Sequence, residues 1–86
     1  MRVLKEFSID GCKVTLYHWN NRYLIKLEQA QLEQTFKVDQ FEFEDEQAVV
    51  RLLDETFVRE AVDRFDAMAR SLHEALRRVD EQSGFG

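Results

Sequence analysis

The sequence predicts an α+β fold, in which a four-stranded antiparallel β-meander is followed by one long C-terminal helix. Apolar and polar residues alternate with period two over the first 38 residues, which is typical of half-buried strands. Asp10-Gly11 and Asn20-Asn21 interrupt this alternation with residues that tolerate the positive φ of tight hairpin turns. The apolar spacing becomes helical after residue 44. With 86 residues, we expect a single domain spanning 1–86.

The strands follow from the turns that separate them. The two turns above and a third at Gln29-Ala30 predict strands over about 2–9, 12–19, 22–28 and 31–38. Gln29-Ala30 has poor turn composition, so the register of the fourth strand is the least determined.

Two-residue turns also predict which residues share a face, because directly opposed residues point the same way. The predicted core-face pairs are Ile9–Cys12, Phe7–Val14, Val3–His18, Leu16–Ile25, Val14–Leu27 and His18–Tyr23. Lys5 and Gln34 are the polar exceptions on this face, and we expect both to reach water from edge strands. Lys13 is expected opposite Glu28 on the other face, which supports the same register.

On the outer face, the same registers predict a cationic and aromatic end. One row reads Arg2–Trp19–Arg22–Lys37, and the next reads Leu4–Tyr17–Leu24–Thr35. The candidate ligand-binding patch consists of Arg2, Tyr17, Trp19, Arg22 and Lys37. One interpretation is structural: the patch packs as a cross-strand ladder, covered by the helix, by a second subunit or by a protein partner. The other is that the aromatic rings stack on unpaired bases while the cations neutralise phosphates.

A helix is predicted over about 45–80, followed by a disordered tail over 81–86. Its apolar stripe has spacings of four and three residues: Val58, Val62, Phe65, Ala69, Leu72, Leu76 and Val79. An earlier stripe is out of phase with this one, and a break near 54–56 would reconcile them. An unbroken helix would be about 54 Å long, whereas strands of eight residues span only about 27 Å. Either the helix breaks and folds back as a two-helix cap, or it pairs with a copy of itself. We expect a homodimer that uses the stripe.

Few residues suggest catalysis. Cys12 and His18 share a face but lie six residues apart on one strand, too far apart to hold one ion. The carboxylates of the helix alternate with arginines at i,i+4 spacing, which is typical of a solvated face. We therefore expect no enzyme, no metal and no cofactor. No apolar run is long enough to cross a membrane and the N-terminus is charged, so a cytoplasmic protein is expected.

The net charge is −5, divided into +2 over residues 1–37 and −7 over residues 38–86. Four antiparallel strands followed by a long dimerising helix resemble, in order of elements, the Whirly-type single-strand-binding fold and its transcriptional-coactivator relatives. No sequence motif accompanies the resemblance, so it assigns no functional residues. It implies single-stranded nucleic-acid binding on the sheet surface, although the acidity of this chain indicates that such binding would be weak. The sequence favours a non-catalytic interaction module, with a weak nucleic-acid binder as the alternative.

Overall fold

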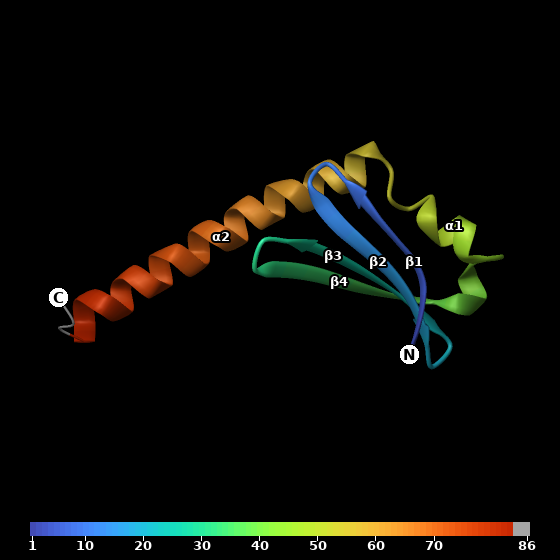
Figure 1. Cartoon of the computed structure of the whole chain (residues 1–86), viewed down its shortest axis with the longest axis horizontal. Helices are drawn as coiled ribbons and strands as arrows, with labels where there is room; N and C mark the ends of the chain where they lie inside the picture. Colours follow the sequence, from blue (N-terminus) through green and yellow to red (C-terminus); the bar gives the residue numbers. More distant parts are fainter. Residues whose placement is uncertain (84–86) are drawn as a thin grey trace.

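The computed structural model describes residues 1–83 and confirms the α+β fold (Figure 1). Four antiparallel strands form one sheet in the order β1-β2-β3-β4, with bounds Arg2–Ile9, Cys12–Trp19, Arg22–Gln29 and Leu32–Asp39. A 3₁₀ turn, η1 (Gln40–Glu42), leads to a short helix α1 (Glu46–Val50) and a long helix α2 (Glu55–Ser83).

The first two hairpins have the predicted turns. Asp10 and Gly11 have φ of 49° and 80°, and Asn20 and Asn21 have φ of 56° and 63°. Two successive residues with positive φ are the mark of the type I′ turn, whose twist matches that of the flanking strands. These turns set the observed β2–β3 register, including the predicted pair Lys13–Glu28.

The third turn differs from the prediction and moves the fourth strand by two residues. Gln29 pairs with Leu32, so the turn consists of Ala30 and Gln31, and Ala30 has the positive φ, 55°. The strand faces are unchanged because the shift is even. The neighbours do change: Asp39, rather than Lys37, lies opposite Arg22.

The β1–β2 register follows the prediction only over its first half. Phe7 pairs with Val14 as expected, but the register shifts between Val3 and Lys5. The extra residue is a β-bulge, which moves every residue that precedes it to the other face of the sheet. The predicted pair Val3–His18 is therefore wrong, and Arg2 lies opposite His18 instead.

The core lies between the inner face of the sheet and the two helices. Its buried members are Cys12, Val14, Leu16, Ile25, Leu27, Val49, Ala61 and Phe65. Gln34, which we expected to reach water, instead contacts α2: its amide donates to the Ala61 carbonyl oxygen at 2.8 Å. This polar contact joins α2 to the edge strand β4.

The helix breaks between α1 and α2, a little before the predicted position. Leu52 and Leu53 donate to the carbonyl oxygens three residues earlier, which tightens the end of α1. Asp54 then caps α2, because its carboxylate accepts from the Phe57 amide at 2.8 Å. The break lets Val49 and Phe65, which belong to the two out-of-phase stripes, enter the same core.

The break does not produce a compact two-helix cap. The 29 residues of α2 make a helix about 43 Å long, and Figure 1 shows its C-terminal half projecting beyond the hairpin ends of the sheet. The molecule accordingly measures 55 × 27 × 19 Å. Since α2 continues to Ser83, the predicted helix end at residue 80 is too early. The rest of the tail expected over 81–86 lies outside the described residues.

Candidate functional site

The row around Trp19 on the outer face is less cationic than predicted. Trp19 pairs with Arg22, which pairs with Asp39. Arg2 has moved to the inner face, because of the bulge in β1. The Trp19 side chain is 50% exposed. The row therefore offers one aromatic ring, one guanidinium and one carboxylate.

The neighbouring row is more apolar and reads Val3–Tyr17–Leu24–Lys37. The Lys26 ammonium lies 5.4 Å from the centroid of the Tyr17 ring. A hydrogen bond with Tyr17 is the main cause that raises the pKa of Lys26, although partial desolvation acts against it. Lys26 is thus held over the ring by a cation–π contact, and Tyr17 is half-buried beside Leu24.

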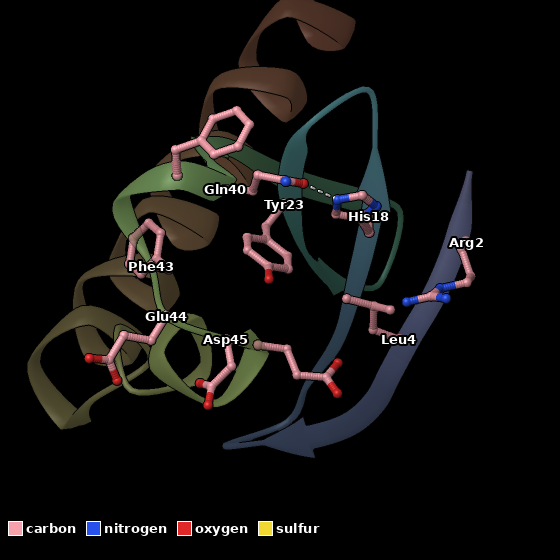
Figure 2. Close-up of a pocket in the computed structure, with 10 residues that line it drawn as sticks. Arg2, Leu4, His18, Tyr23, Gln40, Phe43, Glu44 and Asp45 are labelled. Carbon is pink, nitrogen blue, oxygen red and sulfur yellow. Dashed lines mark hydrogen bonds between the residues drawn. The ribbon is translucent and has the colours of Figure 1, made fainter.

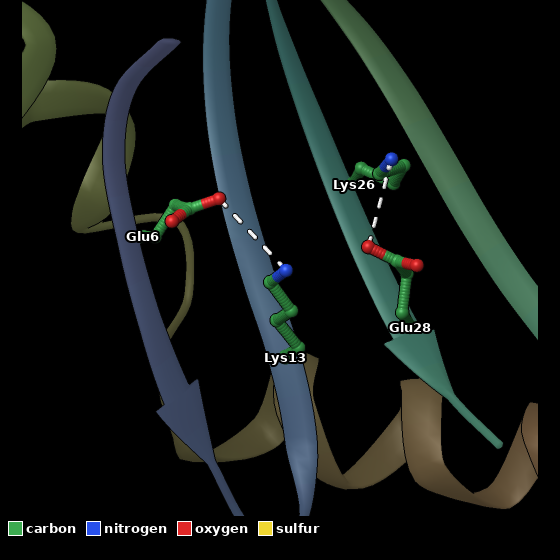
Figure 3. Close-up of polar contacts among 4 residues, drawn as sticks. All are labelled: Glu6, Lys13, Lys26 and Glu28. Atoms are coloured by element: carbon green, nitrogen blue, oxygen red, sulfur yellow. Dashed lines mark ion pairs between the residues drawn. The ribbon is translucent and has the colours of Figure 1, made fainter.

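Positive and negative side chains are equal in number on the outer face. Its cations are Arg22, Lys13, Lys26 and Lys37, and its carboxylates are Glu6, Glu28, Glu33 and Asp39. Figure 3 shows two of the resulting ion pairs, Lys13–Glu6 at 3.9 Å and Lys26–Glu28 at 3.5 Å. The structure thus keeps four of the five predicted patch residues (Tyr17, Trp19, Arg22 and Lys37) on one face, and this face carries no excess of positive charge.

The predicted apolar stripe of α2 divides at the edge of the sheet. Val58 and Phe65 are buried in the core, and Val62 and Ala69 are partly buried. The remaining three residues lie on the projecting half of the helix. Leu72 is 46% exposed, Leu76 is 55% exposed and Val79 is 60% exposed. One continuous stripe therefore forms core at one end and an uncovered apolar surface at the other.

A cavity that the sequence did not predict opens at the other end of the molecule. It has a volume of about 640 Å³ and lies where β1, β2, η1 and the start of α1 meet (Figure 2). Its lining residues are Arg2, Leu4, His18, Tyr23, Gln40, Phe41, Phe43, Glu44, Asp45 and Glu46. The His18 imidazole donates through Nε2 to the Gln40 side-chain oxygen, which fixes the ring at the wall. The bulge and η1 together create this site, and neither has a clear sequence signal.

The other candidate residues are dispersed. Cys12 is buried, and desolvation, with a smaller contribution from Asp10, raises the pKa of its thiol. His73 is exposed on α2, far along the helix from the sheet. Within residues 1–83, His, Cys, Asp and Glu side chains form no group of three or more that could hold a metal ion. No helix in the same range combines the length and apolar character needed to cross a bilayer.

Three surfaces are thus available for contact with another molecule: the outer sheet face, the projecting part of α2 and the cavity beside η1. Comparison with protein-family models, with curated proteins and with solved structures finds no match to this chain.

Proposed function

We propose that the protein is a small non-catalytic interaction module that forms a homodimer through the projecting part of α2. The observation that carries the proposal is the exposure of Leu72, Leu76 and Val79 on a stripe that is elsewhere buried. Three large apolar side chains in line on one helix face favour association. Full burial of one such side chain stabilises by about 1.5–3 kcal/mol, and each of the three has about half of its surface left to bury.

A second copy is the occupant that fits this surface. The stripe keeps its spacing of four and three residues from Val58 to Val79, which is the repeat that two helices need to interlock side chains. The part of α2 beyond Ala69, residues 70–83, is about 21 Å long, which is enough for several interlocking layers. A short domain with a modest core also gains stability from such pairing.

An antiparallel arrangement suits the position of the sheet. In a parallel pair, the two sheets would lie at the same height along the two helices. Each sheet covers the stripe face of its own helix at that height, so the two sheets would compete for the same space. In an antiparallel pair centred near residue 74, Leu72 of one copy faces Leu76 of the other, and Ala69 faces Val79. Each sheet then lies near the end of the opposite helix, and the pairing uses the exposed residues Leu72, Leu76 and Val79 together with the partly buried Ala69.

Light scattering coupled to size exclusion tests the dimer. The monomer mass is 10.3 kDa, and we expect twice that value at tens of micromolar protein, with dissociation on dilution. Leu72→Asp should give a monomer, since it places a charge in the centre of the interface. Ala67→Asp is the matched control, because it adds the same charge to the opposite, exposed face of α2. A monomer at tens of micromolar, or an unchanged mass for Leu72→Asp, would contradict the proposal.

Weak binding of single-stranded nucleic acid by the outer face is the alternative. The half-exposed Trp19 ring beside Arg22 favours it, and the balanced charge of the face opposes it. Trp19 is the sole tryptophan in the chain, so its fluorescence reports directly on base stacking. Quenching by an oligonucleotide at low salt, lost on addition of salt, would support this alternative. Unchanged fluorescence at low salt would exclude it.

A further inference from the structure

The cavity beside η1 has an aromatic wall. The rings of Tyr23 and Phe43 are nearly perpendicular, with an interplanar angle of 87° and centroids 6.4 Å apart. His18 packs on Tyr23 edge to face, with centroids 5.5 Å apart. Phe41, at the rim, is 76% exposed. Two perpendicular rings present one face and one edge to the space between them, and only the face attracts a cation.

The rim next to these rings is acidic. Glu44, Asp45 and Glu46 are consecutive, exposed and part of the lining. Asp45 uses one oxygen to accept from the Ala48 amide, which leaves its other oxygen available. Within residues 1–83, none of the three forms an ion pair closer than 4 Å. Figure 2 shows the Tyr23 hydroxyl directed into the space that Asp45 borders, and this hydroxyl has no hydrogen-bond partner in the described chain.

One cation faces this acidic rim. Figure 2 shows the Arg2 guanidinium on the opposite wall, beside Leu4 and away from Glu44 and Asp45. Arg2 reaches the cavity only because the bulge moves it to the inner face. The lining therefore carries three carboxylates and one guanidinium at its two sides, with aromatic and aliphatic groups between them.

We propose that this cavity binds an organic cation, a primary ammonium or guanidinium group on a short apolar stem. The carboxylate of Glu46 and the Tyr23 hydroxyl receive the N–H donors of the cation, and the face of the Tyr23 ring lies beside it. The stem lies along Leu4. The cation can be a free amine or a basic side chain of a peptide, since both present the same group. The site is at the opposite end of the molecule from the α2 stripe, so it does not depend on the dimer.

Agmatine is a suitable free probe, and N-acetyl-arginine methylamide represents the peptide-bound side chain. Nuclear magnetic resonance titration of the full chain should show saturable shifts at the Tyr23 and Phe43 rings with at least one of them. The uncharged 1-butanol, which has the same four-carbon chain as agmatine but no cation, should leave these resonances unchanged. Saturation by agmatine alone identifies a small-molecule site, and saturation by the capped arginine identifies a peptide site.

Charge variants make the test specific. The variant Glu46→Gln should weaken binding about tenfold, because it removes a charge-assisted hydrogen bond. Arg2→Ala should tighten the binding of agmatine a few-fold, since it removes a like charge from the opposite wall. Glu42→Gln is the matched control: Glu42 is exposed in η1 but is not part of the lining, and its loss should change the dissociation constant less than twofold.

Two results would overturn the proposal. One is the absence of ring shifts with either cation at millimolar concentration. The other is equal weakening by Glu42→Gln and by Glu46→Gln, which would show that only the overall charge attracts the probe.

Discussion

The side chain of Gln34 forms two hydrogen bonds to α2, donating to the Ala61 carbonyl oxygen at 2.8 Å and accepting from Arg64 Nε at 2.9 Å. Arg64 also lies 5.9 Å from the centroid of the Phe36 ring. This edge of the sheet thus holds the first half of α2 by polar contacts as well as by packing. The same anchor sets the direction in which the second half projects.

Gln34→Ala should therefore lower the free energy of unfolding by about 1–2 kcal/mol, because it removes one partly buried and one exposed hydrogen bond. Urea denaturation followed by circular dichroism measures this at one protein concentration. Gln82→Ala, at an exposed position of α2, is the control and should change stability by less than about 0.5 kcal/mol. Equal stability of Gln34→Ala and the parent chain would show that the contact adds nothing.

Ala30→Gly should stabilise the protein by about 0.5–1 kcal/mol. Ala30 has a φ of 55° at the first position of a two-residue hairpin turn, where glycine avoids the clash of a Cβ atom. Ala67→Gly makes the same chemical change within α2 and should destabilise by about 1 kcal/mol. Thermal unfolding of both variants measures the two changes in stability. A loss of stability in Ala30→Gly would show that the backbone of Ala30 is not strained.

The Cys12 thiol should make stability fall at alkaline pH. Burial raises its pKa in the folded protein. The stabilising contribution of the protonated thiol is therefore fully present below the pKa that the thiol has in the unfolded chain. It is lost as the pH rises through the folded value, because the unfolded chain then releases the proton more readily. The urea midpoint of the parent should decline more steeply between about pH 8 and 10 than that of Cys12→Ala. Parallel pH profiles would show that the thiol does not contribute.

The same burial should protect Cys12 from reagents in the folded state. Iodoacetamide at neutral pH should modify it only after unfolding, since the thiolate is the reactive form and the side chain is fully buried. Mass spectrometry of native and urea-treated samples measures the difference. Rapid modification of the native chain would mean that β2 opens readily at this position.

Spin labels distinguish antiparallel from parallel pairing of α2. In a Cys12→Ala background, a label at position 81 lies seven residues from the proposed centre. The two copies of that label would be separated along the axis by about 21 Å in an antiparallel pair. A parallel pair would place them at the same level, separated mainly by the 8–10 Å between helix axes. The shorter distance in a dipolar measurement would contradict the antiparallel arrangement.

The sequence was sufficient for the parts of the fold that depend on local rules. Asp10-Gly11 and Asn20-Asn21 determine their turns through backbone conformation, and these turns then determine β2–β3 pairing over its whole length. The break between α1 and α2 was also indicated, because two apolar stripes out of phase cannot pack on one sheet unless the helix is interrupted.

The remaining features depend on packing that no local pattern records. The third turn uses Ala30 in a strained conformation, so tertiary pairing of β4 outweighs turn preference. The bulge in β1 lies within a regular alternation and leaves no composition signal. Since the cavity needs this bulge to bring Arg2 to its wall, it could not be predicted either. The outer-face patch was predicted in part, and it differs at Arg2 for the same reason.

The bulge in β1 also determines on which face of the sheet the Arg2 charge lies. If Leu4 were deleted, β1 could pair without a bulge while Val3 stayed opposite Tyr17 and Arg2 stayed opposite His18, so the cavity would keep its cation and lose only the Leu4 side chain. The intact strand paired without a bulge would instead place Arg2 opposite Trp19 and remove the cation from the cavity. A change in strand pairing alone, with no change in sequence, would therefore move one positive charge between two surfaces on opposite faces of the sheet.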